Sequence, residues 1–159
     1  MPEAWDTTLL SRVRPGSATY AQVVQCWASG TPVATTAHSI HEIAFGWTLL
    51  GSARGDRGVE FLMRNVQADA FTVLPFSPAA ALLAGELRAA AEHPPHVRHR
   101  DRRPRVRRSV GWTVDLMIAA TAYANGHAIR TANVRDFEEI ARLIARLIPD
   151  GPALAVLPG

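Results

Sequence analysis

The chain has 159 residues, of which 48% are hydrophobic and 19% are charged, so it can bury a core without disulfides. Its formal net charge is +3, and the positive charge comes entirely from arginine because the sequence contains no lysine. That absence excludes a P-loop and a receiver domain, each of which needs a lysine at its site. The sequence also lacks CxxC and HExxH motifs, a GxSxG elbow, and a GxGxxG after any expected strand.

Cys26 is the single cysteine, so no intramolecular disulfide can form, and a reducing compartment is expected. Its apolar neighbours Val23, Val24 and Trp27 favour a packed core side chain over a nucleophile. No charged-then-apolar signal peptide opens the sequence, and no apolar run approaches the length that a bilayer needs. We therefore expect a cytoplasmic protein with no membrane segment.

Short strand-like runs alternate with helical patterns along the chain. Such alternation is typical of an α/β fold whose mainly parallel sheet is buried on both faces. The first strand is the weakest, because Pro2 and Glu3 interrupt it, whereas the last helix is strong, because Phe137, Ile140 and Ile144 share one apolar face. The expected strands are 2–6, 32–36, 70–74, 127–131 and 153–157, and the expected helices are about 18–29, 38–51, 56–68, 77–92, 112–125 and 136–148.

Segment 93–108, HPPHVRHRDRRPRVRR, differs in composition from the rest of the chain. Seven arginines and three histidines accompany a single acid, and the prolines forbid a continuous helix. The segment is either a solvated connector or a surface that binds phosphates. The composition favours neither interpretation, because the answer depends on what lies beside the segment.

Acidic residues from distant parts of the chain are expected at one edge of the sheet. Asp6 ends the first strand, Glu42 lies in the first turns of the helix after the second strand, and Asp136 follows the fourth. Asp115 is expected in the first turn of helix 112–125, where the helix dipole alone would explain an anion. In a parallel sheet these positions gather at the carboxyl edge, where ligands bind. A helix start that is merely exposed to solvent does not require other acidic residues nearby, so we interpret Asp115 as a metal ligand.

The chemistry of such a cluster follows from its charge. Two carboxylates about 4 Å apart repel by roughly 4 kcal/mol at an effective dielectric near 20, so the group must protonate or hold a cation. Oxygen ligands suit Mg²⁺ or Mn²⁺ and not zinc. His38 and His41 could bind a softer metal, but no third nitrogen or sulfur ligand has matching spacing, so we interpret them as the polar start of a helix. The cation would activate water for attack on phosphorus, and the arginine-rich segment indicates nucleic acid as the phosphodiester. Relief of repulsion predicts that Asp6→Ala or Asp115→Asn leaves the fold intact or more stable.

Three blocks of the sequence resemble motifs of PIN-domain nucleases. WDTTLL (5–10) resembles the family's DT(S/N)-x-L opening, and TTAHSIHEIAFG (35–46) resembles its T-S-x-x-x-x-E-x-x-x-G segment. VDLMIAATAYANGHAIRTANVRDFEEI (114–140) resembles the most specific motif, and VLPFSPAAALLAGELR (73–88) resembles the linking strand and helix. The resemblance implies a PIN-like three-layer α/β/α domain over residues 1–159, with a mainly parallel five-stranded sheet and 93–108 as a connector within it.

Within that family the sequence is most similar to VapC-type toxins of toxin–antitoxin pairs. The similarity implies an Mg²⁺-dependent endoribonuclease, with Mn²⁺ as an alternative ion, that acts on RNA as a homodimer and is held inactive by a small cognate antitoxin. Some members place an acid where Asn133 stands and others where Asp136 stands, and we favour Asp136 because Asn133 cannot supply a charge. The implied catalytic residues are Asp6, Glu42, Asp115 and Asp136, with the metal on Asp6 and Asp115 and with Thr7, Thr131 and Asn133 as supporting pocket residues. The implied RNA-binding residues are Arg98, Arg100, Arg102, Arg103, Arg105, Arg107 and Arg108.

The sequence also departs from that family. The first strand lacks a run of aliphatic residues, segment 93–108 is unusually long and rich in arginine, and helix 136–148 is extended. One alternative function is a PIN-like module that binds RNA without cutting it, although such a module has no reason to keep mutually repelling carboxylates. Another is a metal-dependent phosphatase of small phosphate esters, which would need no arginine-rich segment.

Helices 38–51 and 56–68 carry more apolar residues than a core requires. Core packing explains most of them, and we expect the surplus to receive an amphipathic helix of the antitoxin. The residues in question are Trp47, Leu49, Leu50, Phe61 and Leu62.

Overall fold

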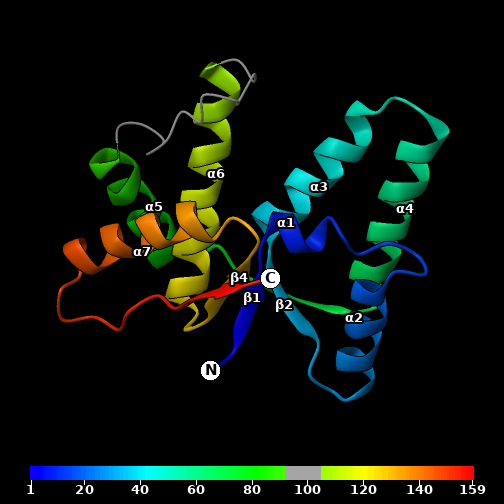
Figure 1. Ribbon diagram of the computed structural model, residues 1–159, viewed down its shortest axis with the longest axis horizontal. Coiled ribbons are helices and arrows are strands. Elements are labelled where there is room, and N and C mark those ends of the chain that lie inside the picture. Colours follow the sequence, from blue (N-terminus) through cyan, green and yellow to red (C-terminus); the bar gives the residue numbers. More distant parts are fainter. Residues whose placement is uncertain (92–104) are drawn as a thin grey trace.

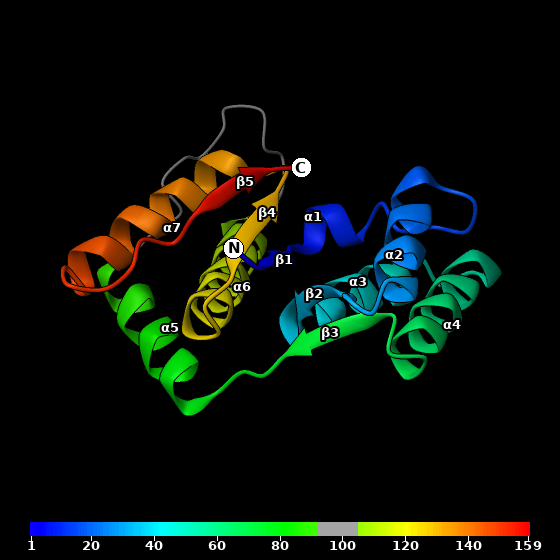
Figure 2. The same cartoon turned by 90° about the horizontal axis from the view of Figure 1, so that it is seen from below.

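The computed structural model describes residues 1–91 and 105–159, and of residues 105–109 it describes the backbone alone. Within these ranges one sheet of five strands, all paired in parallel, lies between two groups of helices (Figures 1 and 2). The strands are β1 (Glu3–Trp5), β2 (Val33–Thr36), β3 (Phe71–Leu74), β4 (Ala128–Thr131) and β5 (Val156–Pro158), in the order β3-β2-β1-β4-β5. The predicted α/β fold, three-layered and built on a parallel sheet, is confirmed.

Helices connect successive strands, and several begin at side chains that cap their first turn. Ser17, Thr36 and Ser77 each accept a hydrogen bond from a backbone N–H of the helix that follows. The helices are α1 (Thr7–Leu10), α2 (Ala18–Ala28), α3 (Ala37–Leu49), α4 (Ala53–Gln67), α5 (Pro78–Ala90), α6 (Arg105–Ala124) and α7 (Val134–Leu147). In the described part of the chain, no helix is long and apolar enough to cross a membrane.

Each face of the sheet has its own apolar core, because successive side chains of a strand point to opposite faces. Ala4 and Ile129 face a core that α5, α6 and α7 complete. Trp5 and Val33 face a second core, to which α1, α2, α3 and α4 contribute. The sheet is therefore buried between helices on both sides, as a parallel sheet requires.

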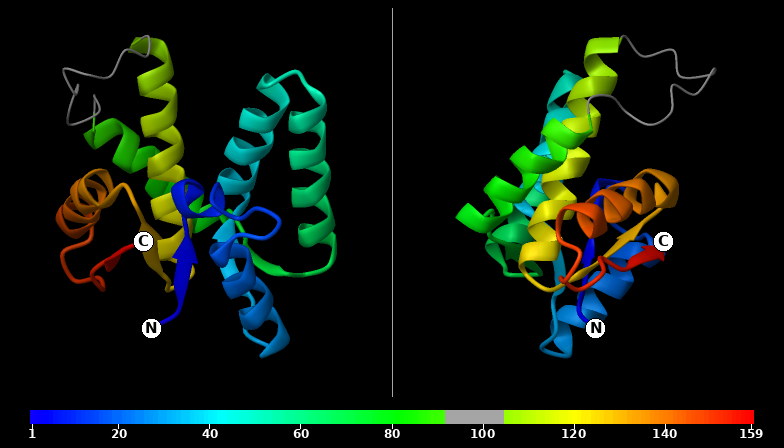
Figure 3. Two further views of the ribbon diagram at one scale, coloured as in Figure 1. Left: turned by 45° about the vertical axis from the view of Figure 1, so that its right-hand side comes forward. Right: turned by 90° about the vertical axis from the view of Figure 1, so that its left-hand side faces the viewer.

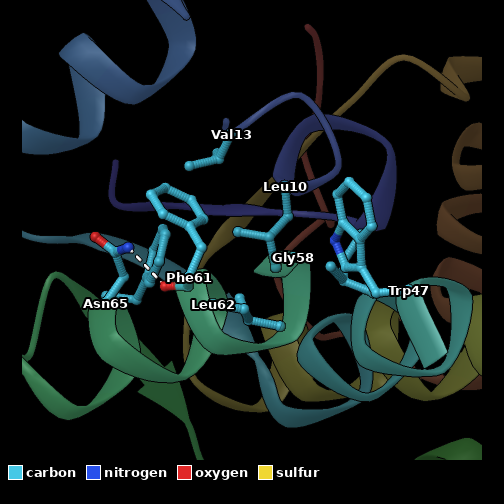
Figure 4. A pocket seen from close by; sticks show the side chains of 9 residues that line it. Leu10, Val13, Trp47, Gly58, Phe61, Leu62 and Asn65 are labelled. Atoms are coloured by element: carbon cyan, nitrogen blue, oxygen red, sulfur yellow. Dashed lines mark hydrogen bonds between the residues drawn. The ribbon is translucent and has the colours of Figure 1, made fainter. Parts of the chain in front are cut away.

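Helices α3 and α6 extend beyond the carboxyl edge of the strands (Figures 1 and 3). α3 continues away from the end of β2, and α4 returns beside it before entering β3. The two helices approach closely where the indole of Trp47 lies against Gly58, beside Phe61 and Leu62 (Figure 4). The space enclosed there is only about 10 Å³, barely enough for one water, so this seam is packing and not a ligand site.

The structure differs from the sequence expectations by three residues or more at four places, one of which is the start of α4 at Ala53 instead of 56. The four-residue helix α1 was not expected, and β5 begins at Val156, three residues after the predicted start. Helix α6 begins at Arg105, seven residues before the predicted start, so the last four residues of the expected connector 93–108 are helical. The sequence has a proline at position 104, which disfavours a helix that extends further toward the N-terminus, because proline is not tolerated inside a helix.

The contact between Trp47 and Gly58 generates a stability prediction. Alanine normally stabilises a helix relative to glycine by roughly 0.5–1 kcal/mol. A Cβ on Gly58 would overlap the Trp47 ring, whereas a Cβ on Gly85 in α5 meets open space. In chemical denaturation, Gly58→Ala should lower the free energy of unfolding and Gly85→Ala should raise it; a stabilising Gly58→Ala would contradict the packing of α3 on α4.

Candidate active site

The Asp6 carboxylate is buried at the end of β1, with only 2% of the residue exposed. Its Oδ1 accepts hydrogen bonds from the backbone N–H of Thr8 (3.0 Å), the hydroxyl of Thr8 (2.7 Å) and the backbone N–H of Leu9 (3.2 Å). Its Oδ2 accepts the hydroxyl of Thr131 at the end of β4 (2.7 Å). Asp6 is thus the N-cap of α1 and also a link between β1 and β4.

The same hydrogen-bond network reaches the start of α7. The hydroxyl of Thr131 accepts the backbone N–H of Asn133 (2.8 Å), and the hydroxyl of Thr8 accepts the backbone N–H of Ala132 (2.9 Å). The Asn133 side-chain amide then donates to Oδ2 of Asp136 (2.9 Å). Asp6 and Asp136 are therefore held in one network, in which the Asn133 side chain is a neutral donor to Asp136.

This network lies where the strand order reverses. From β1 the chain proceeds to β2 and β3 on one side, and it later returns to β4 and β5 on the other side. Asp6 follows β1 and Thr131 ends β4, so both lie at the carboxyl edge of the two strands that flank the reversal. Ligands of open parallel sheets bind at such a position.

Glu42 and Asp115 come from two helices that contact each other, α3 and α6. Both side chains are half-buried. Because α6 begins at Arg105, Asp115 lies in the middle of that helix and not in its first turn, so the helix dipole does not explain its position. Among residues 1–91 and 110–159, no three acidic, histidine or cysteine side chains are close enough to form a ready-made metal cluster.

A divalent cation nevertheless fits the chemistry of this site. Mg²⁺ is commonly held by one or two carboxylates, with waters and substrate phosphates completing its shell, so a cluster of three acids is not required. Oδ2 of Asp6 accepts one hydrogen bond and keeps a lone pair for a further partner. The adjacent residue in the sequence is Thr7, a predicted pocket residue, and its hydroxyl is buried without a hydrogen-bond partner.

Thr8 is the site residue that the sequence prediction missed. Its hydroxyl donates to Asp6 and accepts from Ala132, so it fixes the carboxylate to two segments at once. The signal was present in the sequence, because an aspartate followed two and three residues later by free N–H groups is a capping pattern. Sequence analysis missed this signal because α1 has only four residues, too few to show a helical periodicity.

His38 and His41 extend this site along α3. The His38 ring meets the Phe76 ring edge-on (centroids 4.6 Å apart), and its Nδ1 is buried without a hydrogen-bond partner. Burial lowers the pKa of His38, and the neighbouring His41 lowers it further. Nδ1 of His41 lies 3.9 Å from Oε1 of Glu42, a loose contact in an exposed setting.

The arginines assigned to RNA fall largely outside the described structure. Arg98, Arg100, Arg102 and Arg103 lie outside the described residues. Arg105, Arg107 and Arg108 belong to the first turn of α6, with their side chains not described.

A separate groove of about 490 Å³ runs between α2 and α4. Val24 and Trp27 of α2 line it and are substantially exposed, while Phe61 and Arg64 line it from α4. Of the residues expected to form an apolar surplus on α3 and α4, Leu62 is buried and Trp47 is packed against Gly58, whereas Leu49 and Leu50 at the end of α3 are 59% and 55% exposed.

Comparison with known proteins shows which family and which solved structures resemble this arrangement. A family model described as PIN domain matches residues 5–143. The structure of VapBC2 from Rickettsia felis bound to a DNA fragment from their promoter has a TM-score of 0.63 at 16% identity, covering 100% of this chain and 99% of that chain. DNA-bound VapBC from Salmonella typhimurium gives 0.61 at 17% identity, covering 99% and 98%, and FitAcB from Neisseria gonorrhoeae gives 0.54 at 20% identity, covering 97% and 95%. At these identities the similarity shows a shared fold, and no curated protein matches the sequence significantly.

The hydrogen bonds of Asp6 reverse the stability expectation made from charge repulsion. Asp6→Ala removes the cap of α1 and leaves buried donors of Thr8, Leu9 and Thr131 unpaired, so we expect the free energy of unfolding to fall by roughly 1–3 kcal/mol. Asp6→Asn keeps an acceptor for the cap and should lose less. Chemical denaturation of both variants measures the difference, and an Asp6→Ala variant more stable than the wild type would show that repulsion dominates.

The environment of His38 predicts a loss of stability in acid. Because the pKa of His38 is lower in the folded state, His38 binds a proton in the unfolded chain first as the pH falls through its ordinary pKa of 6.5. His38→Phe removes that proton and keeps a ring against Phe76, so its free energy of unfolding should fall less than that of the wild type between about pH 7.5 and about pH 5. Parallel pH dependences of the two proteins would contradict the burial of neutral His38.

Proposed function

The chain belongs to the PIN domain family, and from that premise we propose that it is an Mg²⁺-dependent endoribonuclease toxin of the VapC type, held inactive by a cognate antitoxin. The observation that carries the proposal is the Asp6 carboxylate, buried and fixed by four hydrogen bonds at the carboxyl edge where the strand order reverses. A purely structural cap does not require the additional tie to β4 and α7. A fixed carboxylate with one lone pair left over is suited to bind a cation.

The proposed roles follow from the placement of each acid. Asp6 and Asp115 hold the cation, with Mn²⁺ as an alternative to Mg²⁺. Glu42 and Asp136 complete the acidic pocket from α3 and α7, and Asn133 fixes Asp136 through its side-chain amide. When bound, the ion activates water for attack on phosphorus and stabilises the leaving oxygen.

The substrate is proposed to be RNA. PIN domains are generally nucleases that depend on divalent metals, which supports a phosphodiester as the substrate. The seven arginines of segment 93–108 supply sequence-independent phosphate contacts, and the segment leads directly into the helix that carries Asp115. As in the resembling toxins, we expect the active form to be a homodimer in the cytoplasm.

The antitoxin is proposed to bind the groove between α2 and α4. The structurally similar proteins from R. felis and S. typhimurium are VapBC complexes, which supports a protein partner for this chain. The exposed Val24 and Trp27 offer an apolar surface for an amphipathic helix, and Arg64 offers a partner for an acidic side chain. A basic residue at the end of the bound segment could then reach Glu42 and Asp136.

Cleavage of RNA tests the nuclease. With purified protein, total RNA and Mg²⁺, we expect Asp6→Asn and Asp115→Asn each to lower the cleavage rate by roughly 100-fold or more, and EDTA to abolish cleavage by the wild type. Asp136→Asn should lose far more activity than Asn133→Ala, because only the former removes a charge.

Undiminished cleavage in EDTA would reject the metal mechanism. Absence of cleavage in both Mg²⁺ and Mn²⁺, together with retained RNA binding, would replace the nuclease by the binding-only module. A larger loss with Asn133→Ala than with Asp136→Asn would move the fourth position to Asn133.

Co-expression tests the partner. A small protein encoded beside this gene should restore growth to cells that produce the chain, and Trp27→Ser should weaken the complex by roughly tenfold or more while leaving RNA cleavage intact. Leu82→Ser is the matched control, because Leu82 is 72% exposed on α5, which packs on the other face of the sheet. Equal losses with the two variants, or none with Trp27→Ser, would exclude the groove.

A further inference from the structure

One partly exposed face of α3 carries aromatic rings on both sides of Glu42. His38, His41, Glu42 and Phe45 are spaced at i, i+3, i+4 and i+7, so they share a face of the helix. The opposite side of α3 holds the buried Ile43. On the shared face His38 and Glu42 are half-buried, whereas His41 and Phe45 are exposed, Phe45 with 53% of its surface.

The rings of this face are ordered by one another. The His41 and Phe45 rings are stacked with an angle of 12° between their planes and centroids 6.3 Å apart. The His38 ring is fixed edge-on by Phe76, which follows β3 and is itself 39% exposed. Two histidines and two phenylalanines thus form two ring pairs, one between the start of α3 and the residues after β3 and the other in the middle of α3.

The chemistry of this surface favours a nucleobase over an apolar protein helix. Bases stack on aromatic and imidazole rings by their faces, at roughly 1–3 kcal/mol per base. A helix docking here by its apolar side would bury Glu42 and His41, which lie among the rings, without suitable partners. Only unpaired bases can offer a free face to the rings, because paired bases stack within their own duplex.

We propose that His38, His41, Phe45 and Phe76 form a base-stacking platform that seats unpaired nucleotides of the substrate beside Glu42. The inference rests on the proposed ribonuclease function and narrows its substrate class to single-stranded RNA or unpaired loops. The platform orients the strand by its bases, while the acids at the carboxyl edge act on the phosphate. His38, His41, Phe45 and Phe76 are accordingly positioning residues and not catalytic ones.

Fluorescence binding tests the platform with a single-stranded RNA of about ten nucleotides that carries 2-aminopurine, whose emission is quenched by stacking. The measurement uses the full chain with Asp6→Asn, so that the strand is not cut. Phe45→Leu, which keeps an apolar side chain but removes the ring, should weaken binding by roughly 5- to 150-fold and abolish the quenching, the equivalent of about 1–3 kcal/mol. Phe45→Trp should retain both, and Leu82→Ala on α5 should change neither.

Each alternative result overturns the platform. These results are an unchanged affinity in Phe45→Leu, equal losses in Phe45→Leu and Phe45→Trp, or an equal loss for a fully paired hairpin. Unchanged RNA binding with weaker inhibition by the antitoxin would assign this face to the antitoxin. The cleavage-competent chain distinguishes the two proposals. If the wild type quenches the probe but cuts no RNA, the platform is retained and the nuclease is rejected. If the wild type does not quench the probe and cuts RNA only as fast as its Phe45→Leu variant, the nuclease is retained and the platform is rejected.

Discussion

The buried carboxylate of Asp6 is the constraint on which the site depends. A charged group that is 2% exposed is stable only if its lone pairs are satisfied, and Thr8, Leu9 and Thr131 satisfy them from three directions. Those bonds start α1, join the ends of β1 and β4, and continue through Asn133 to Asp136. The fold thereby prepares one oxygen of Asp6 at the only point of the sheet, among the described residues, where the strand order reverses.

The long helices around that point present separate surfaces, to which we assign separate functions. α6 has 20 residues, about 30 Å at 1.5 Å per residue, and α3 likewise extends past the strands, so both carry side chains beyond the carboxyl edge. Glu42 and Asp115 are placed there by helices in contact, and the aromatic platform continues along α3. The groove between α2 and α4 is formed by other residues of the second core, so the apolar part of the antitoxin is proposed to bind away from the platform, with only its basic end reaching the acids.

Most of the fold could be predicted from the sequence, because the apolar runs of short strands and the amphipathic patterns of helices depend on local periodicity. α1 escaped prediction because four residues contain no full period, and its helical state depends on the Asp6 cap, which is itself fixed by Thr131 from 125 residues away. Thr8 was missed because it belongs to this short helix, whereas Asp6, Glu42, Asp115 and Asp136 were named from topology and resemblance. Charge alone predicted that removing Asp6 would leave the fold intact or more stable, and the hydrogen bonds argue the opposite, because repulsion was considered without the donors that Asp6 accepts. The α3 platform was missed because the periodicity of the sequence does not show which side chains are exposed, and exposure is what distinguishes Phe45 from core residues.

The central claim is that Asp6 holds a divalent cation at the reversal of the strand order, and paramagnetic broadening by Mn²⁺ in amide NMR spectra tests it without any substrate. At substoichiometric Mn²⁺ we predict selective loss of the amide signals of Thr8, Leu9 and Asn133 in the wild type, and their persistence in Asp6→Asn. Excess Mg²⁺ should restore the wild-type signals. Broadening that is absent, unaffected by Asp6→Asn, or centred on the exposed imidazole of His41 would contradict the account.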